Sequence, residues 1–301
     1  MSVVVLSKAE LHLHLEGSIF LETLQEIDHS ITAEEFQSRM RHRNFAEFLE
    51  GYKWATTRLQ TPEHYALATR NLLERLEAQE VTYVEITLSA GVVLWKQQDL
   101  AAVYEAVWRA SQKSRVETFW ILDVIRHFGA EPAWPVVRFA AERRNDGVVA
   151  FGIGGDEARG PAQWFGEMFQ YARDQGLHLV AHAGETMGPE SIWAALAIGA
   201  ERIGHGVSAV RDPVLLAELK ARNIPLEVCL TSNVCTGVVA SLEEHPVRCA
   251  YDAGVPITLN TDDPAFFETS LNQEYAIAER LFGLAPEEMA ANARRYAFRA
   301  G

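Results

Sequence analysis

The chain has 301 residues, of which 48% are hydrophobic and 23% are charged, as in globular proteins with a large core. Its 41 acidic and 27 basic side chains give a formal charge of −14 at pH 7, which would repel phosphate backbones and anionic lipid. Nucleic acid and membranes are therefore not expected partners. The short apolar start, SVVVL, is not typical of a signal peptide, and no run resembles a membrane span, so a cytoplasmic location is expected.

Eight short β-rich segments predict eight strands. In chain order they are residues 10–15, 81–89, 118–125, 148–155, 178–185, 202–208, 225–233 and 256–263. Helical patterns separate most of them, including residues 99–115, 160–176 and 212–223. Strands that alternate with helices pair in parallel, and eight such units predict a closed (β/α)8 TIM barrel, with an open doubly wound sheet as the alternative. Without a repeat or a linker, one domain over residues 1–301 is expected.

One connection is much longer than the others. Residues 16–80, between the first and second predicted strands, contain helical patterns near residues 33–50 and 62–79. An insertion at this point lies at the mouth of a barrel. It is expected to form either a lid over the site or additional packing around the rim.

Titratable side chains first gather in the segment HLHLE. His12 and His14 are two residues apart on a strand, so they point to the same side, and Glu16 continues the spacing. Two imidazoles on one strand face are suitable ligands for a Zn²⁺ ion. Such a pair also occurs in strands as surface or packing residues, so this segment alone does not decide between the two interpretations.

Three other predicted strands end in similar side chains. His182 and Glu185 end the fifth strand, His205 lies on the sixth, and Asp262 and Asp263 end the eighth. The carboxyl ends of barrel strands meet at one rim, where barrel enzymes carry their active sites. One buried histidine could be a core residue, but the recurrence at four strand ends favours a functional site.

The segments HLHLEG, GGDE, HAGE, GHG, SN and NTDDP occur in this order over nearly the whole chain. Together they resemble the adenosine deaminase family of the amidohydrolase superfamily. The resemblance implies zinc-dependent, hydrolytic removal of the C6 amino group of a purine. It also implies a set of four zinc ligands, namely His12, His14, His182 and Asp262.

The same resemblance implies roles for the other site residues. Glu185 would donate a proton to purine N1, and His205 would orient and deprotonate the metal-bound water. Asp263 would bind N7, the backbone of Gly155 would contact N3, and Glu16 would lie near the 5′ end of the ribose. Zinc lowers the pKa of bound water to about 7, and a proton on N1 withdraws electrons from C6, so both roles suit the reaction.

One metal ion per chain is expected. Binuclear members of the wider superfamily use a carboxylated lysine near the end of the fourth strand as a bridge. The five lysines of this chain lie elsewhere, at Lys8, Lys53, Lys96, Lys113 and Lys220. The H-x-E and P-C-x-x-C pattern of the other zinc deaminases is also absent.

The expected substrate is a 6-aminopurine nucleoside, either adenosine or a relative modified at the 5′ position. GGDE resembles the nucleoside branch of the family, although Glu16 stands where many adenosine deaminases have Asp and adenine deaminases often have Glu. The stretches FLEGYKWATTRLQTPEHYAL and EITLSAGVVLWKQQD resemble a bacterial subgroup associated with 6-amino-6-deoxyfutalosine. Alternatives are adenine, another amine or amide hydrolysed by one metal ion, and a non-catalytic nucleoside-binding barrel.

A substrate extended at the 5′ position requires contacts beyond the ribose. Candidates for a cationic or hydrogen-bonding contact are Arg58, Lys53, Arg126 and His127. An ordinary surface or structural role is the usual alternative for each of them. Trp54 and Trp95 could form a wall of the same pocket, although packing in the core or lid is the usual role of large aromatic side chains.

Overall fold

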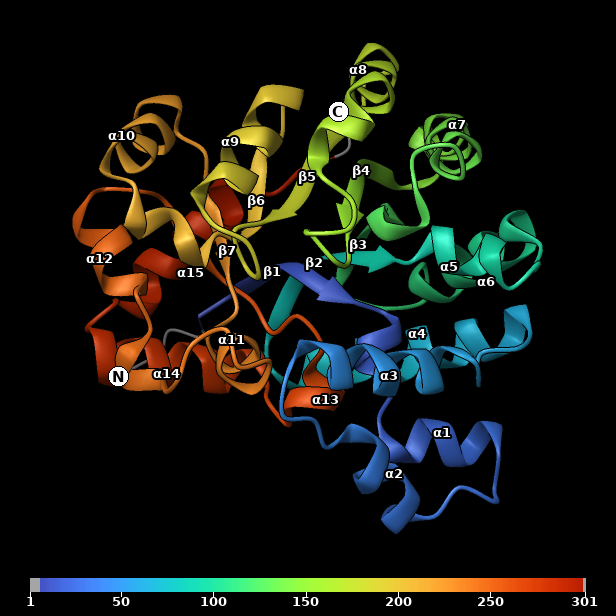
Figure 1. Cartoon of the computed structure of the whole chain (residues 1–301). Coiled ribbons are helices and arrows are strands. Elements are labelled where there is room, and N and C mark those ends of the chain that lie inside the picture. Colours follow the sequence, from blue (N-terminus) through green and yellow to red (C-terminus); the bar gives the residue numbers. More distant parts are fainter. Residues whose placement is uncertain (1–5, 300–301) are drawn as a thin grey trace.

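The computed structural model describes residues 6–299 and is built around a ring of eight parallel strands (Figure 1). The strands are β1 (Lys8–His14), β2 (Val81–Leu88), β3 (Glu117–Ile125), β4 (Val148–Gly154), β5 (His178–Ala183), β6 (Arg202–His205), β7 (Leu226–Val228) and β8 (Ile257–Leu259). Each strand pairs with the next in the sequence. A bridge between Leu13 and Asp262 joins the chain beyond β8 to β1. The predicted TIM barrel is therefore confirmed, and the open sheet is excluded.

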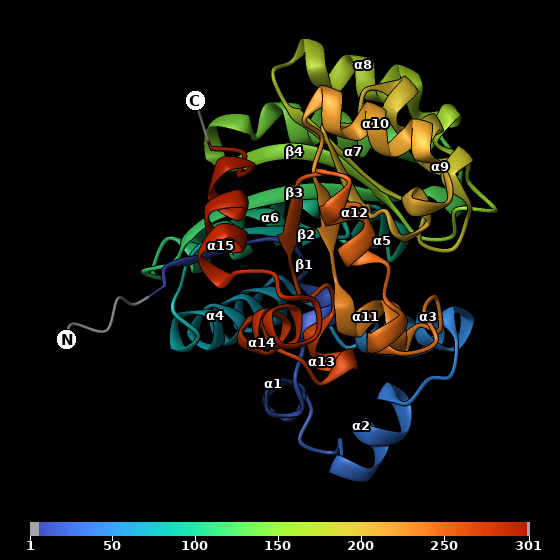
Figure 2. The ribbon, with the colours of Figure 1, turned by 90° about the vertical axis from the view of Figure 1, so that its left-hand side faces the viewer.

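Helices surround the strands (Figure 1 and Figure 2). They are α1 (Leu21–Ile27), α2 (Ala33–Met40), α3 (Phe45–Thr56), α4 (Pro62–Ala78), α5 (Ala90–Trp95), α6 (Leu100–Ser111), α7 (Ala133–Glu142), α8 (Gly166–Asp174), α9 (Pro189–Ile198), α10 (Pro213–Arg222), α11 (Leu230–Cys235), α12 (Val247–Asp252), α13 (Pro264–Phe267), α14 (Leu271–Phe282) and α15 (Pro286–Arg295). Among these described helices, none combines the length and the hydrophobicity that crossing a bilayer requires.

Helix α6 illustrates why these segments form an outer layer. Leu100, Val103 and Val107 recur at helical spacing and are buried against the barrel. Asp99 caps the first turn by accepting a hydrogen bond from the backbone N–H of Ala101 at 2.9 Å. The apolar face thus fixes how the helix packs, and the cap fixes where it begins.

The predicted strand over residues 225–233 is wrong in its second half. β7 ends at Val228, and α11 begins at Leu230. The run CLTSNVC has the β-branched content of a strand, but tertiary contacts override this preference: Ser232 donates a hydrogen bond to Asp262, and Asn233 bonds to His205. A helical turn brings both side chains into the barrel, where a strand would have pointed them in opposite directions.

The long connection between β1 and β2 contains four helices rather than the predicted two. The pattern over residues 33–50 is divided into α2 and α3, because Asn44 caps a new helix by accepting a hydrogen bond from the N–H of Glu47 at 3.0 Å. α1 was not predicted. In both views α1 and α2 project away from the barrel (Figure 1 and Figure 2). α3 instead packs against α13 through Phe48 and Phe266, at the mouth of the barrel.

Candidate metal and substrate site

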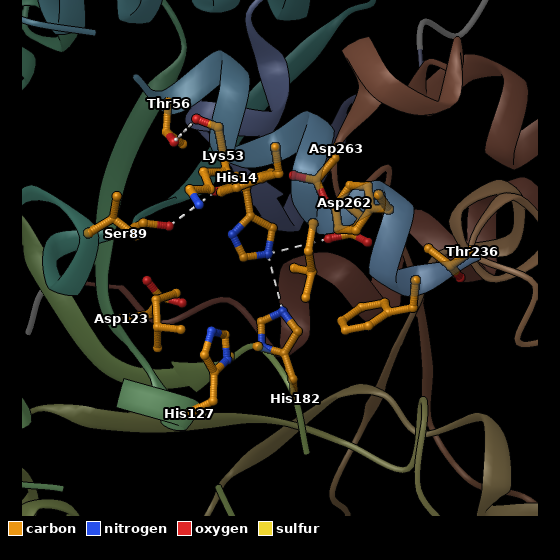
Figure 3. Close-up of a pocket in the computed structure, with 18 of the residues that line it drawn as sticks. His14, Lys53, Thr56, Ser89, Asp123, His127, His182, Thr236, Asp262 and Asp263 are labelled. Atoms are coloured by element: carbon orange, nitrogen blue, oxygen red, sulfur yellow. Dashed lines mark hydrogen bonds and ion pairs between the residues drawn. The ribbon is translucent and has the colours of Figure 1, made fainter. Parts of the chain in front are cut away.

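A cavity of about 310 Å³ opens at the carboxyl ends of the strands (Figure 3). Its polar end is formed by His14, His182, Glu185, His205, Asp262 and Asp263. Its apolar part extends between α3 and α5 and is formed by Phe45, Phe48, Leu49, Val92, Trp95 and Phe128. The cavity therefore joins a cluster of titratable groups to a hydrophobic chamber, an arrangement typical of sites for small molecules.

Four potential metal ligands meet at the polar end. His12, His14, His182 and Asp262 each offer one atom, and these atoms all lie within 4.8 Å of one another. The Nε2 atom of His14 is 3.1 Å from that of His182 and 3.3 Å from Oδ1 of Asp262, as Figure 3 shows. The Nε2 atom of His12 is buried and has no hydrogen-bond partner among residues 6–299. Three imidazole nitrogens and one carboxylate oxygen are a donor set that fits a divalent ion such as Zn²⁺.

Hydrogen bonds on the far side of two rings fix which nitrogen faces this cluster. Nδ1 of His12 lies 2.8 Å from Oε2 of Glu227, and Nδ1 of His182 lies 3.1 Å from the carbonyl oxygen of Ile153. In the neutral rings Nδ1 then carries the proton, and the Nε2 lone pair is free for a metal ion. Glu227 was not predicted; the available signal was a charged residue within the apolar segment PLEVCL.

Two of the site residues adopt the left-handed backbone region that L-residues rarely occupy. The φ angle is +63° at His205 and +66° at Asp262. Two backbone bonds hold Asp262 in place: its carbonyl accepts from the N–H of His14 at 2.9 Å, and its N–H donates to the carbonyl of His12 at 3.1 Å. Local backbone strain of this kind is concentrated at functional sites. His205 is the last residue of β6, Asp262 lies beyond the end of β8, and both residues line the cavity.

Glu185 and His205 lie side by side next to the four potential metal ligands. Nε2 of His205 is 3.7 Å from Oε2 of Glu185 and 3.9 Å from Oδ2 of Asp262. Burial, reinforced by the charges of Asp262 and Glu157, raises the pKa of Glu185 well above its usual range. The carboxyl group of Glu185 therefore keeps its proton to a higher pH than an exposed glutamate does, which suits a proton donor.

Glu157 positions the loop that carries Glu185. Its carboxylate accepts hydrogen bonds from the backbone N–H groups of Gly184, Glu185 and Thr186, at 2.8, 3.0 and 2.8 Å. Burial acts to raise the pKa of Glu157, but hydrogen bonds from Ser191 and this loop outweigh it and keep the pKa below the usual range. No role was predicted for Glu157, the last residue of GGDE; in the structure its carboxylate anchors the loop.

Asp263 and Gly155 line the same cavity. Oδ1 of Asp263 is buried without a hydrogen-bond partner among the described residues, and burial together with Asp262 raises the pKa of this carboxyl well above its usual range. A Cβ atom on Gly17 would lie 1.6 Å from Oδ1 of Asp263, so only glycine leaves room for that carboxyl. Gly155 has a φ of +89°, a backbone conformation that favours glycine, and it lines the cavity.

Glu16 lies behind the cavity wall. It has no exposed surface, is not part of the lining formed by residues 6–299, and accepts a hydrogen bond from the N–H of Ser89 at 3.2 Å. Burial raises its pKa to about 7. The carboxylate that does line this part of the cavity is Asp123 of β3, which the sequence analysis did not single out. Its signal was an acidic residue inside the apolar run WILDVI.

The candidates for a contact beyond the ribose divide into two groups. Lys53, His127 and Trp95 line the cavity, as does Arg159, which was not predicted. Arg58 and Trp54 are not among the described lining residues: the guanidinium of Arg58 lies 5.1 Å from the Trp54 ring.

Arg126, the fourth candidate, is not part of the described lining of the cavity. This side chain is fully buried, and its guanidinium donates a hydrogen bond to the carbonyl oxygen of His182 at 2.7 Å. Its Nε and Nη1 atoms have no hydrogen-bond partner among residues 6–299. The bond to His182 supports the strand that carries a potential metal ligand, so the described contact of Arg126 is a structural one.

A barrel with three imidazoles and a carboxylate at its carboxyl rim is typical of the metal-dependent hydrolases of the amidohydrolase type. Within this class the chain belongs to the adenosine deaminase family, whose sequence model matches residues 7–300.

Relatives in this family differ in the substrates that their names give. The aminodeoxyfutalosine deaminase of Streptomyces coelicolor is 39% identical over 293 residues, which cover 93% of this chain and 76% of the relative. The adenine deaminase of Rhizobium johnstonii is 35% identical over 298 residues, which cover 96% and 92%. The crystal structure of the adenine deaminase from Arthrobacter aurescens superposes with a TM-score of 0.90 at 28% identity, covering 98% of this chain and 94% of that one.

Proposed function

We propose that this chain removes the C6 amino group of a 6-aminopurine nucleoside by hydrolysis, with one Zn²⁺ ion, and releases ammonia. The main observation behind this proposal is that four potential metal ligands meet in one cavity with two carboxyl groups whose pKa values burial raises, those of Glu185 and Asp263. The deaminase names of the relatives support this reaction class.

The ligand set of His12, His14, His182 and Asp262 supports zinc, because imidazole nitrogens and a carboxylate are common zinc ligands. When bound, the ion would supply the nucleophile by lowering the pKa of a coordinated water to about 7. None of the five lysines of the sequence lies in β4 or in the turn that follows it. A bridge for a second ion is therefore missing, which favours a mononuclear site.

The other groups are suited to hold and activate a purine ring. Glu185 donates its proton to N1, which withdraws electrons from C6 as water adds there. Asp263, whose pKa is also raised by burial, would donate a hydrogen bond to N7, and the backbone of Gly155 would contact N3. Two carboxyl groups with raised pKa values match two ring nitrogens that only accept hydrogen bonds, whereas hydrolysis of a simple amide requires no such pair.

The shape of the cavity favours a nucleoside with a substituent at the 5′ position over free adenine. Beyond the polar end, the chamber between α3 and α5 would remain unfilled by a bare base. Its walls are largely apolar, and Lys53 and Arg159 add two cationic groups. An aromatic carboxylate in place of the 5′-hydroxyl fits these features, so 6-amino-6-deoxyfutalosine is the proposed substrate, in agreement with the name of the Streptomyces relative.

A panel of four compounds tests this proposal. Adenosine, adenine, 5′-methylthioadenosine and 6-amino-6-deoxyfutalosine are incubated with the zinc-loaded protein, and the conversion to the 6-oxopurine spectrum and the release of ammonia are followed. We expect the highest kcat/KM for 6-amino-6-deoxyfutalosine. A preference for adenine would overturn the substrate, and no conversion of any compound would overturn the reaction.

Variants of the cationic residues test whether the cavity binds the carboxylate of the proposed substrate. Arg159→Gln and Lys53→Gln should raise the KM for the carboxylate-bearing substrate about tenfold, since each removes one charge-assisted contact, and should leave adenosine nearly unchanged. Arg58→Gln is the matched control, because Arg58 stacks on Trp54 instead of lining the cavity. Equal effects of all three variants would contradict this substrate assignment.

A further inference from the structure

A buried chain of hydrogen bonds connects His205 to the backbone of α12. Nδ1 of His205 lies 3.1 Å from Nδ2 of Asn233, and Oδ1 of Asn233 lies 3.1 Å from Nε2 of His245. The backbone N–H of Val247 donates to Nδ1 of His245 at 3.2 Å. The side chains of His205, Asn233 and His245 are all buried, so each polar atom in this chain needs a hydrogen-bond partner inside the protein.

The donor and acceptor of each of these hydrogen bonds follow from the last bond, in which the N–H of Val247 donates to His245. A backbone N–H can only donate, and the N–H of Val247 is one of the first of α12, which have no partner inside the helix. Nδ1 of His245 is therefore an acceptor. Burial lowers the pKa of His245 to about 4, so the ring is neutral and its proton is on Nε2.

The remaining two bonds are then determined as well. Nε2–H of His245 donates to Oδ1 of Asn233, which turns the NH₂ group of Asn233 toward His205. This NH₂ group can only donate, so Nδ1 of His205 is an acceptor. The proton of the neutral His205 ring must be on Nε2, the nitrogen that faces Glu185 and Asp262.

We propose that His205 acts in the cavity as an N–H donor and not as the base that deprotonates water, and that Asn233 and His245 are positioning residues that hold it in this tautomer. The role in the reaction rests on the proposed function, whereas the tautomer does not. This inference replaces the role that the family resemblance implied for His205.

The opposite tautomer is incompatible with the chain of bonds. A free lone pair on Nε2 of His205 requires a proton on Nδ1, which Asn233 could accept only by turning its oxygen toward His205. Its NH₂ group would then face Nε2 of His245, while Val247 still donates to Nδ1. His245 would have to accept at both nitrogens, which a neutral imidazole cannot do. A doubly protonated His205 is excluded for the same reason.

A proton on Nε2 of His205 would assist the addition of water to C6. Nε2 of His205 lies 3.7 Å from Oε2 of Glu185 and 3.9 Å from Oδ2 of Asp262, so its hydrogen points toward the space between these carboxyls and the ring that would be attacked. Negative charge that develops on the attacking oxygen is stabilised by a donor already in place. The energetic gain is largest in the transition state, as catalysis requires.

Each proton transfer of the deamination can be assigned without using His205 as a base. Glu185 gives its proton to N1, and the water loses one proton to the carboxylate of Asp262 as its oxygen bonds to C6. Asp262 passes this proton to the amino group, the C6–N bond breaks, and ammonia leaves. The hydroxyl on C6 returns a proton to Glu185 as the carbonyl forms, which restores both carboxyl groups.

Nuclear magnetic resonance tests the tautomer directly. Long-range ¹H–¹⁵N spectra of ¹⁵N-histidine-labelled protein distinguish protonated from unprotonated ring nitrogens, and the signals of His205 are those missing from a His205→Gln sample. We expect protonated Nε2 and unprotonated Nδ1 in both zinc-loaded and metal-free protein at neutral pH. A proton on Nδ1 of His205 in the zinc-loaded protein would overturn the proposal, whether or not the protein deaminates any compound in the panel.

The activity of the Asn233→Asp variant shows whether His205 acts as a hydrogen-bond donor or as a base. A carboxylate of nearly the same shape still accepts from His245, but it can only accept from His205, so it moves the proton of His205 to Nδ1 and frees Nε2. If His205 acts as a donor, kcat should fall about 10²- to 10³-fold with little change in KM and in zinc affinity. If His205 acts as a base, the variant retains or gains activity, and the inference is wrong.

Replacements of His245 provide a second, independent comparison. His245→Gln carries an NH₂ group that can still donate to Asn233, so it should preserve the tautomer of His205 and most of the activity. His245→Met has no donor, so it should give a mixture of tautomers in the spectra and a loss of at least tenfold in kcat. Equal spectra and equal rates for the two variants would show that His245 does not position His205.

Discussion

Glu227 binds the imidazole of His12 on the side away from the metal cluster, with Oε2 2.8 Å from Nδ1. Its other oxygen lies 2.6 Å from Nε of Arg202, which also pairs with Glu85. All four side chains are buried in the barrel. The network therefore holds His12 with its Nε2 atom toward His14 and Asp262, and the geometry of the metal cluster depends on a carboxylate that does not belong to it.

Replacing this carboxylate should weaken metal binding without removing a ligand. Glu227→Gln keeps the shape of the side chain but loses the charge that holds the Nδ1 proton of His12 and pairs with Arg202. We expect the affinity for Zn²⁺ to fall about 10- to 100-fold. Competition with a chromogenic chelator measures this affinity, and circular dichroism shows whether the variant remains folded.

Glu201→Gln is the matched control for Glu227→Gln. Glu201 also pairs with a histidine, His178, at 2.9 Å, but both side chains are about 42% exposed and lie away from the metal cluster. An exposed pair of this kind contributes little, so zinc affinity should be unchanged. If the two variants bound zinc equally well, the positioning role of Glu227 would be refuted.

Replacing Glu185 and replacing Asp262 should have different effects on zinc content. Glu185→Gln removes the proton donor but none of the four ligands, so zinc content should stay near one per chain while kcat falls about 10²- to 10⁴-fold. Asp262→Ala should lose both metal and activity. Metal analysis alongside steady-state kinetics checks the pair; a fully active Glu185→Gln protein would contradict the role of Glu185 as proton donor.

Gly17 tests the position of Asp263 without changing Asp263 itself. In Gly17→Ala the new methyl group would lie 1.6 Å from Oδ1 of Asp263 and displace that carboxyl. Because misplacement of a contact group by about 1 Å can cost about 10²-fold, kcat/KM should fall by that order. In the control Gly166→Ala the nearest atom, on Ile198, lies at an ordinary 3.6 Å, and the rate should be unchanged. Equal rates in both variants would argue against a substrate contact by Asp263.

His245 should make the stability of the protein depend on pH. Burial lowers its pKa from 6.5 to about 4, so between these values the unfolded chain binds a proton that the folded chain does not. The free energy of unfolding therefore decreases as the pH falls below 6.5, by about 2 kcal/mol between pH 7 and pH 5 from this group alone.

His245→Gln cannot take up that proton. Urea unfolding of the metal-free proteins at pH 7 and pH 5 should show a smaller decrease for His245→Gln than for the unchanged chain, by the same amount of about 2 kcal/mol. The metal-free form is used because protonation of the ligands would otherwise release zinc in this range. Identical decreases would show that His245 is not held neutral in the folded state.

The barrel and the convergence of the four potential metal ligands could be predicted because they depend on patterns that are local in the sequence. Each of the eight strands is a short β-rich run, and the histidines and carboxylates lie where these runs end. The carboxyl ends of barrel strands share one rim, so the convergence of residues as distant as His12 and Asp262 follows from the fold class alone.

What the sequence did not reveal are the contacts that orient these side chains. Glu227, Asn233 and His245 reach their partners across the barrel, and α11, which carries Asn233, has a composition that favours a strand. Arg126 was one of four candidates for a contact beyond the ribose, with a structural role as the alternative. Only the packing of the loop shows that its guanidinium is turned inward, to the carbonyl of His182.

Zinc titration of the metal-free protein, with deamination of the best compound in the panel followed at each point, tests the central proposal most directly. The structure offers one set of four ligands with Glu185 and Asp263 beside it, so we predict that activity rises linearly and reaches its plateau at one equivalent of Zn²⁺. A plateau at two equivalents, or full activity before any zinc is added, would contradict deamination at a single-metal centre.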